Sequence, residues 1–152
     1  MKSIKETFIS STFWTESIGP TAALKTLEVM EKKKSWKYIT ALGSNITLRW
    51  KNLAKKHKIK IRTTGIPALC TFTFLSKNHQ AYKTFITQEM LRKGFLATTT
   101  IYVSIAHTNK ILDKYFKNLD ILFKIISKCE KGDDIYRYLK TKNSETDFAR
   151  LN

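Results

Sequence analysis

The strongest constraint on the fold is an apolar stripe near the C-terminal end of the chain. Between residues 108 and 126, apolar side chains recur at steps of three and four, with lysine, asparagine and aspartate between them. That spacing places the apolar side chains on one face of an α-helix, and Thr108 or Asn109 can cap its first turn. The sequence therefore predicts a long amphipathic helix whose core-facing residues are Ile111, Leu112, Tyr115, Phe116, Leu119, Leu122, Phe123 and Ile126.

Three other segments have helical patterns. Residues 20–34 contain no helix breaker after Pro20, and proline suits a first helical position because its missing N–H would be unpaired there. Around residues 82–90 the helical spacing returns, and Gly94 fits a C-terminal stop. Residues 35–57 carry a second apolar stripe, made of Trp36, Ile39, Leu42, Ile46, Trp50 and Leu53.

Alternating apolar and polar residues predict three short strands. The first covers residues 59–63, the second covers residues 68–74 beyond a turn at Gly65, and the third covers residues 101–105. Helices and strands thus follow one another in the order helix, helix, strand, strand, helix, strand, helix. This order predicts the α+β class, with a small sheet covered by helices.

The net charge is the one compositional feature that indicates a partner. The chain has 28 basic and 12 acidic residues, a formal charge of +16, and basic domains attract nucleic acid through phosphate contacts. Lysine supplies all but five of the bases and is spread along the chain, whereas arginine is preferred for phosphate and base recognition. A solvated lysine-rich surface is favoured over a nucleic-acid interface with Trp14, Trp36 and Trp50 as stacking groups, because Trp36 and Trp50 fall on an apolar stripe.

The sequence contains no self-contained active site. Its 5 glycines are isolated, so it has no glycine-rich phosphate loop, and the motifs of serine hydrolases and zinc proteases are missing. We interpret His57, His79 and His107 as surface or capping residues, and Cys70 and Cys129 as buried thiols. No apolar run reaches the roughly 18 residues of a membrane span, and we recognise no signal sequence, so we expect a cytoplasmic protein without membrane contact.

Residues 7–20 combine hydroxyl and aromatic side chains just before a predicted helix. Hydroxyls and free backbone N–H groups at a helix N-terminus can together hold an anion such as phosphate. The same residues also fit an ordinary capping loop, because serine and threonine are common before helices. On the residues alone both interpretations stay open, and the capping loop is slightly favoured.

Four segments, in the same order, carry a resemblance to a known family. Residues 8–19, Phe-Ile-Ser-Ser-Thr-Phe-Trp-Thr-Glu-Ser-Ile-Gly, resemble a loop of the class III pyridoxal-phosphate-dependent aminotransferases, particularly the branch of glutamate-1-semialdehyde aminomutase. Residues 65–69 resemble the turn that enters the sheet of the family's small domain, and residues 87–97 resemble the helix and turn that lead to the active-site edge. Residues 102–108 resemble the strand and helix start that carry a variant of the Ser-x-Ala-His-Thr motif. In the family, the loop carries a threonine that binds the phosphate of the pyridoxal phosphate held by the other subunit. By position that threonine is Thr12, with Ser11 beside it.

The resemblance implies a homodimer of fold type I, in which a large domain binds pyridoxal phosphate as a Schiff base on a lysine. In the family that lysine lies upstream of the loop, and the carboxylate beside the pyridine nitrogen is also missing here, so we expect the chain to be inactive without a large domain. The implied divisions are a phosphate-contact loop belonging to the large domain at residues 1–19, an interdomain helix at 20–34, the C-terminal small domain at 35–129 and a polar tail at 130–152.

The sequence departs from the family where substrate would bind. Val103 and Ser104 stand in the region where many class III members have an arginine for a substrate carboxylate, and residues 98–100 are shorter and less charged than the corresponding loop of the aminomutases. The resemblance therefore implies a small-molecule amino donor and acceptor without identifying either. Two alternatives remain beside the aminotransferase, a small basic nucleic-acid-binding protein and a noncatalytic interaction module that has kept the fold.

Overall fold

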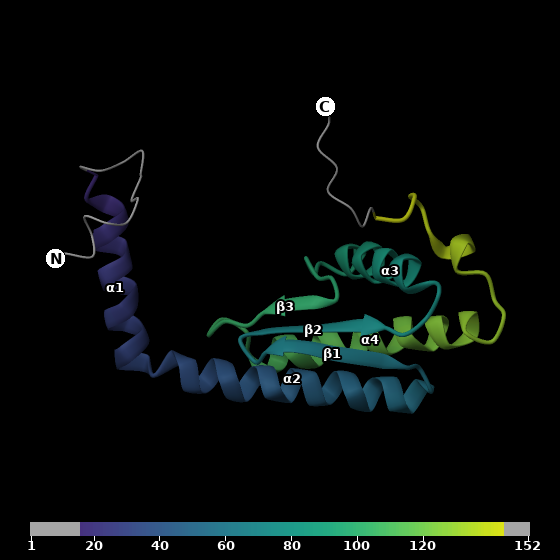
Figure 1. The fold of residues 1–152 in the computed structure, drawn as a ribbon, viewed down its shortest axis with the longest axis horizontal. Helices are drawn as coiled ribbons and strands as arrows, with labels where there is room; N and C mark the ends of the chain where they lie inside the picture. Colours follow the sequence, from purple (N-terminus) through teal and green to yellow (C-terminus); the bar gives the residue numbers. More distant parts are fainter. Residues whose placement is uncertain (1–15, 145–152) are drawn as a thin grey trace, which may run out of the picture. The chain divides into compact units, whose positions relative to one another are not determined.

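The computed structural model describes residues 16–144 of the chain. Their contacts divide into two compact units, with the boundary between Ser35 and Trp36. Figure 1 shows the order of the helices and strands along the chain. Within the part of the chain that the structure describes, no helix is both long and apolar enough to cross a membrane.

Helix α1 belongs to the first unit and spans Ile18–Lys33, so it begins two residues before the predicted start. Pro20 lies in its first turn, where the missing N–H of proline leaves no helical hydrogen bond unmade. At the other end Lys34 adopts a left-handed conformation with φ 47°, and its N–H donates to the carbonyls of Glu31 and Met30. Lysine thereby closes this helix in the conformation that glycine usually provides.

The second unit is built on a three-stranded antiparallel sheet with the strand order β1-β2-β3 (Figure 1). Strand β1 covers Ile61–Ile66, β2 covers Leu69–Phe74 and β3 covers Thr100–Tyr102. Within the hairpin Ile66 pairs with Leu69 across a two-residue turn, and Leu69 pairs with Tyr102 on the other side of β2. Because helices pack on this small sheet, the predicted α+β class is confirmed.

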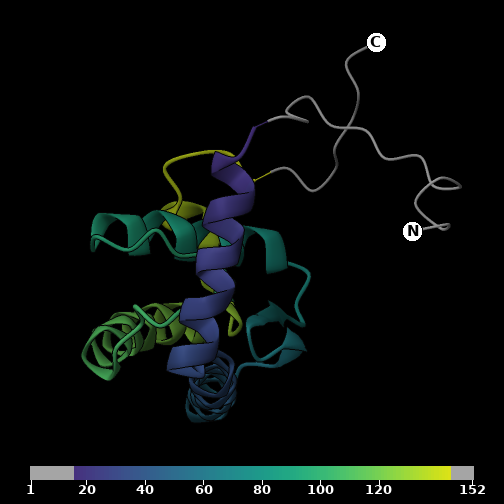
Figure 2. The ribbon, with the colours of Figure 1, turned by 90° about the vertical axis from the view of Figure 1, so that its left-hand side faces the viewer.

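Three helices supply most of the core of the second unit. Helix α2 spans Ser35–His57, as predicted, α3 spans His79–Arg92 and α4 spans Asn109–Cys129. Helices α2 and α4 run side by side in Figures 1 and 2. The predicted stripe of α4 is buried except for Ile111, which is 43% exposed; its buried members are Leu112, Tyr115, Phe116, Leu119, Leu122, Phe123 and Ile126.

Alternate residues of the central strand β2 face these helices. Cys70, Phe72 and Phe74 are almost fully buried, and the ring of Phe72 lies 4.8 Å from that of Trp50 on α2. The indole Nε1 of Trp50 donates to the hydroxyl of Tyr115 on α4 at 3.2 Å, which satisfies a polar group that burial would otherwise leave unpaired. Both α2 and α4 are therefore held to the same strand.

Trp36 differs from the prediction that placed it in the core. It lies in the first turn of α2 and is 46% exposed, whereas Trp50 on the same helix is 0% exposed. Figure 1 shows that the first turns of α2 extend beyond the ends of the strands. The apolar stripe therefore continues along the helix further than the sheet that it covers.

Residues 130–144, expected as part of a polar tail, pack against α3. Ile135, in the 3-10 helix η2 (Ile135–Tyr138), is 1% exposed. The side-chain amide of Gln88 donates to the carbonyl of Tyr138 at 2.9 Å, and its oxygen accepts from the N–H of Lys140 at 2.7 Å. The N–H of Ser144 donates to the hydroxyl of Thr84 at 2.9 Å. Polar side chains of α3 thus bind the backbone of this segment.

Candidate functional site

The two predicted phosphate-binding residues, Ser11 and Thr12, lie outside the described residues 16–144. The structure does describe the helix start that follows them. There the carboxylate oxygens of Glu16 accept from the N–H of Gly19 at 3.0 and 3.1 Å, and Ser17 makes no side-chain cap. The Gly19 N–H is therefore already paired with a negative charge, so an anion bound near this helix end would depend mainly on the upstream hydroxyls.

The motif at residues 65–69 forms the turn of the β1–β2 hairpin and packs directly on α2. Gly65 has φ +91°, a conformation in which a side chain would be strained. Opposite the turn, a Cβ on Gly43 of α2 would lie 1.8 Å from the carbonyl oxygen of Pro67. The helix and the hairpin therefore meet backbone to backbone at a point where only glycine fits.

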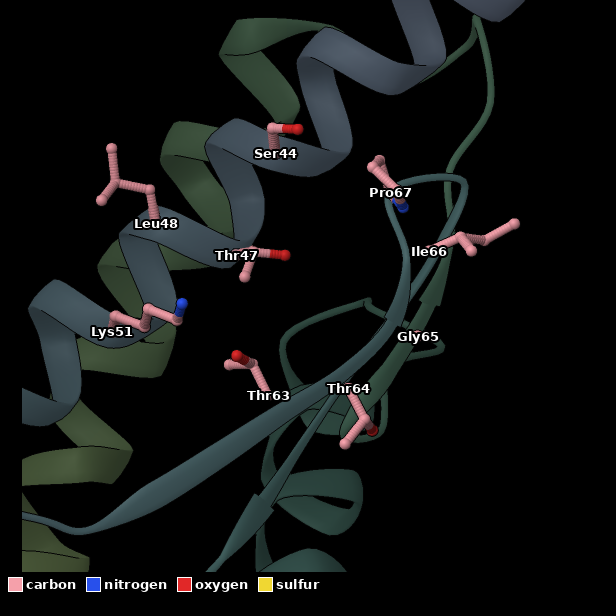
Figure 3. A pocket seen from close by; sticks show the side chains of 9 residues that line it. All are labelled: Ser44, Thr47, Leu48, Lys51, Thr63, Thr64, Gly65, Ile66 and Pro67. Carbon is pink, nitrogen blue, oxygen red and sulfur yellow. The ribbon is translucent and has the colours of Figure 1, made fainter.

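Beside this close contact, α2 and the hairpin line an open surface pocket of about 280 Å³, which we call the hairpin pocket (Figure 3). In Figure 3 the hydroxyls of Ser44 and Thr47 point from α2 toward the hairpin, and the hydroxyl of Thr63 points back from β1 toward the side of Lys51. No carboxylate is among the lining residues. The rest of the lining consists of Leu48, Thr64, Gly65, Ile66 and Pro67.

The other motifs of the resemblance surround a second, largely apolar pocket of about 360 Å³. Gly94 follows α3 with φ +80°, and the loop after it forms one wall of this pocket, with Leu96 97% exposed. The start of α4 and strand β3 form the other walls. The lining residues are Phe95, Leu96, Ala97, Thr98, Thr100, Ile101, Tyr102, His107, Ile111, Leu112 and Tyr115.

His107 organises the start of α4 rather than facing a reaction partner in the described residues. Its Nδ1 accepts from the N–H of Ser104 at 3.0 Å, and its carbonyl accepts from the hydroxyl of Tyr38 at 2.8 Å. Thr108 caps the helix as predicted, since its hydroxyl accepts from the N–H of Ile111 at 3.3 Å. In this chain the Ser-x-Ala-His-Thr motif therefore forms a turn and a helix cap.

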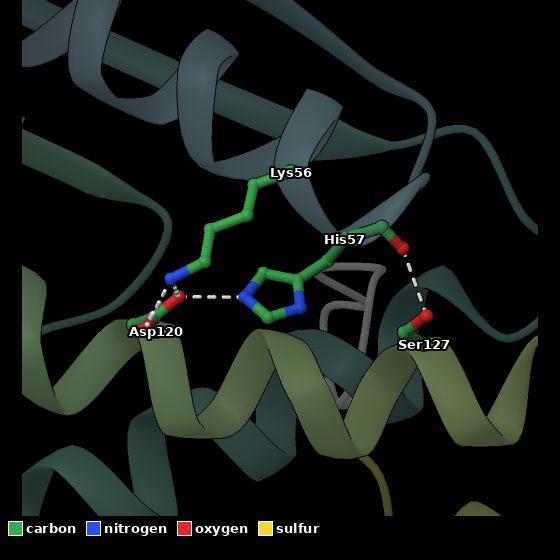
Figure 4. Close-up of polar contacts among 4 residues, drawn as sticks. All are labelled: Lys56, His57, Asp120 and Ser127. Atoms are coloured by element: carbon green, nitrogen blue, oxygen red, sulfur yellow. Dashed lines mark hydrogen bonds and ion pairs between the residues drawn. The ribbon is translucent and has the colours of Figure 1, made fainter.

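A cluster of residues of catalytic type lies between α2 and α4 (Figure 4). The carboxylate of Asp120 accepts from Lys56 at 2.8 Å and lies 2.6 Å from Nε2 of His57. Hydrogen bonds from Lys56 and His57 lower the pKa of the Asp120 carboxyl. The hydroxyl of Ser127 donates to the main-chain carbonyl of His57 and not to its ring, so no serine is activated here. The cluster joins two helices.

The described residues offer no catalytic nucleophile of their own. Every lysine among them is exposed, whereas a lysine that forms a Schiff base has its pKa lowered by burial or by a nearby cation. Burial raises the pKa of the thiols of Cys70 and Cys129, which makes them poor nucleophiles. Nor do residues 16–144 contain a group of side chains that could hold a metal ion.

Comparison with known sequences finds one informative relative. No protein-family model matches the chain. Over 81 residues the chain is 28% identical to a 3-aminobutyryl-CoA aminotransferase of Cloacimonas acidaminovorans (strain Evry). The match covers 53% of this chain and 20% of the aminotransferase. The chain therefore matches only a small part of that aminotransferase's length.

Comparison with solved structures finds a similar fold. The fold matches that of the FumI protein of Sphingopyxis sp. MTA144, solved in its PLP internal aldimine form, with a TM-score of 0.72 and 15% sequence identity. The match covers 90% of this chain and 33% of that protein. Together the two matches confirm the resemblance to a part of a pyridoxal-phosphate-dependent aminotransferase. Neither of them distinguishes the aminomutase branch from other branches.

Proposed function

We propose that the chain forms the C-terminal domain of a pyridoxal-phosphate-dependent aminotransferase, a homodimeric cytoplasmic enzyme that transfers an amino group between small molecules. The fold match carries this proposal, because it extends over 90% of the chain with a TM-score of 0.72 while covering only 33% of a protein in its PLP internal aldimine form. The aminotransferase relative supports the same assignment from the sequence. Because fold alone is weak evidence for function, the proposal also depends on the agreement between the fold match and the sequence match.

In this proposal a large domain supplies the lysine and the carboxylate that hold the cofactor. The cofactor provides an electron sink for the amino-group transfer, and the protein orients it. The exposure of every described lysine supports a division of labour in which the cofactor's lysine lies elsewhere. The second unit contributes a packed frame, in which aromatic side chains of β2 contact α2, α3 and α4.

Ser11 and Thr12 are the residues of this chain that we propose to touch the cofactor. Their hydroxyls would donate to the phosphate of the pyridoxal phosphate held by the partner subunit, as the resemblance implies. Phosphate accepts such hydrogen bonds strongly because it is charged. The pairing of the Gly19 N–H with Glu16 supports a contact through the hydroxyls rather than through this part of the helix end.

Reconstitution with a large domain tests the proposal. The purified chain is mixed with the large domain of the Cloacimonas aminotransferase from which the C-terminal domain has been removed. We expect a complex that retains pyridoxal phosphate, measured by its visible absorbance after gel filtration and by borohydride fixation. Neither polypeptide alone should retain as much cofactor. Absence of both association and cofactor retention would count against an aminotransferase domain.

Substitutions in the loop test the cofactor contact in the same complex. Thr12→Val removes a hydroxyl at nearly constant volume and should weaken cofactor retention by about tenfold, as expected for hydrogen bonds to a charged group. Thr7→Val, in the same segment but outside the proposed contact, is the matched control. Equal retention by both variants would exclude Thr12 as a phosphate ligand. Ser11→Ala is expected to have a smaller effect than Thr12→Val.

The formal charge of +16 leaves nucleic acid as the second candidate partner. The burial of Trp50 removes one of the stacking groups that this function would use. Binding of the chain to random DNA with a steep dependence on salt concentration would support this candidate, because each phosphate contact releases counterions. Binding that stays weak at low salt would leave the aminotransferase domain as the favoured function.

A noncatalytic module would associate with a large domain without raising cofactor retention.

A further inference from the structure

We propose that the hairpin pocket binds a phosphate monoester of a small organic molecule. The pocket lies between α2 and the β1–β2 hairpin and has a volume of about 280 Å³ (Figure 3). It combines hydroxyl donors on two opposite walls, one ammonium group and an apolar portion. None of these three features depends on the proposed aminotransferase function.

Two hydroxyls of the hairpin pocket, those of Ser44 and Thr63, are available to a ligand, whereas the hydroxyl of Thr47 is in hydrogen-bond contact with the thiol of Cys70. Some hydroxyls of the described helices bond to the carbonyl four residues earlier, as those of Thr26, Thr84 and Thr87 do. Within residues 16–144 no such hydrogen bond is formed by Ser44, and the hydroxyl of Thr63 likewise has no hydrogen-bond partner there. Donors that face each other across a cavity suit a tetrahedral oxyanion, whose oxygens point in several directions.

The charge around the hairpin pocket favours an anion. Lys51 supplies an ammonium group and forms no salt bridge with any carboxylate of the described residues, and Lys55 follows one turn further along the same side of α2. Arg49 and Lys56, by contrast, are paired with Asp113 and Asp120 of α4. Positive charge on the α4 side of α2 is therefore compensated, while the charge beside the hairpin is not.

The apolar part of the lining indicates that the ligand carries an organic group. Leu48 and Pro67 contribute apolar surface to the same pocket, and binding sites for small molecules typically combine such surface with a few polar groups. The carboxylate-free lining disfavours cations and amines. A phosphate monoester meets both requirements, since its phosphate satisfies the hydroxyls and the lysine and its carbon chain contacts the apolar residues.

Titration of the purified 152-residue chain with propyl phosphate tests this inference. Amide shifts are followed by NMR at constant ionic strength, and inorganic phosphate, sulfate and propionate are titrated in parallel. We expect saturable shifts centred on Ser44, Thr47, Lys51 and Thr63, with propyl phosphate binding more tightly than inorganic phosphate. Equal affinity for all four anions, or shifts spread over the lysines of the whole surface, would overturn the proposal.

Two matched variants separate the pocket from general attraction to a basic protein. Lys51→Met and Lys55→Met remove the same charge one turn apart on α2, but only Lys51 lines the pocket. We expect Lys51→Met to weaken propyl phosphate binding by about tenfold, and Lys55→Met to weaken it by less than about twofold. Equal losses would overturn the proposal. Unchanged far-ultraviolet circular dichroism and thermal melting confirm that both variants are folded, and the result does not depend on whether an aminotransferase large domain is found.

Discussion

The two sides of helix α2 use their polar residues in opposite ways. On the side of α4, Arg49 pairs with Asp113 at 2.8 Å and also lies 4.1 Å from the ring centre of Phe116. Lys56 and His57 both contact Asp120 there. On the side of the hairpin, Lys51 lines a cavity without an ion-pair partner in the described residues. The polar residues of α2 that face α4 thus stabilise the fold, whereas Lys51 on the hairpin side remains available to a ligand.

This difference follows from what each neighbour offers. Helix α4 presents two carboxylates, those of Asp113 and Asp120, about two turns apart, so cations on α2 meet them when the helices run side by side. The hairpin presents threonines, glycine, isoleucine and proline, and its backbone lies close to that of α2 at Gly43. Surface ion pairs of this kind stabilise proteins only weakly, so the clearest structural requirement on α2 lies at the glycine contact.

Among the substitutions on either side of α2, Gly43→Ala should change the unfolding free energy most, because it forces the hairpin away from the helix. The added Cβ would lie 1.8 Å from the Pro67 carbonyl oxygen, and overpacking of this kind costs about 2 to 3 kcal/mol of unfolding free energy. Urea unfolding followed by circular dichroism measures this loss. Alanine at an unhindered helix position would instead stabilise the protein by about 1 kcal/mol, so the sign of the change in unfolding free energy tests the contact with Pro67. Asn45→Ala, at an exposed position of the same helix, is the control.

Asp120→Asn tests the opposite side of α2 and should cost about 1 kcal/mol, since the two contacts are partly exposed. Contacts with Lys56 and His57 lower the pKa of Asp120 in the folded protein. Its stabilisation is therefore complete above the unfolded pKa of about 4 and is lost as the pH falls through the lower folded value. Urea unfolding as a function of pH should show this loss in the wild type and not in the variant. A parallel loss in both proteins would contradict the assignment.

Asp113→Asn is the matched control for that experiment. Among residues 16–144 the Asp113 carboxylate forms an ion pair with Arg49 alone, and its side chain is 69% exposed, so its removal should cost less than that of Asp120. A larger cost for Asp113→Asn would mean that the cation over the Phe116 ring depends on this carboxylate more than the geometry indicates.

A pair of serine substitutions includes the smallest expected effect, that of Ser44→Ala. Ser127→Ala removes a hydroxyl that donates to the His57 carbonyl at 2.8 Å and should cost about 1 kcal/mol. Ser44→Ala removes a hydroxyl that faces the hairpin pocket and should change the stability by less than about 0.5 kcal/mol. Thermal unfolding of the two variants compares them directly. A similar loss in Ser44→Ala would show that its hydroxyl supports the fold.

The helices were predictable because their periodicity comes from the core that they cover. Residues 35–57 form α2 with the predicted ends, and Thr108 caps α4 as expected. The strands were less predictable at their ends. Strand β1 covers Ile61–Ile66 instead of residues 59–63, because Gly65 at φ +91° continues the pairing with β2 to a two-residue turn. Strand β3 ends at Tyr102, shortly before the turn that His107 and Ser104 form.

The candidate site was less accessible to sequence reasoning than the fold. Ser11 and Thr12 followed from a resemblance, and they remain predictions because they lie outside the described residues. The hairpin pocket was not anticipated, although Ser44, Thr47 and Lys51 recur at steps of three and four along α2. That spacing was a signal for a polar stripe, but helical surfaces are commonly polar. Only the position of Thr63 on β1, which is distant from this stripe in the sequence, shows that the stripe faces a hydroxyl of the hairpin.

By itself the sequence determined the helix-covered sheet, the positions of its helices and the burial of Cys70 and Cys129, because local periodicity records which side chains avoid water. Tertiary structure alone decided that Trp36 is exposed while Trp50 is buried, that residues 130–144 bind α3, and that donors of α2 and β1 share a cavity. These outcomes depend on where one element ends relative to another. Contacts between residues far apart in the chain set those positions, and no local pattern encodes them.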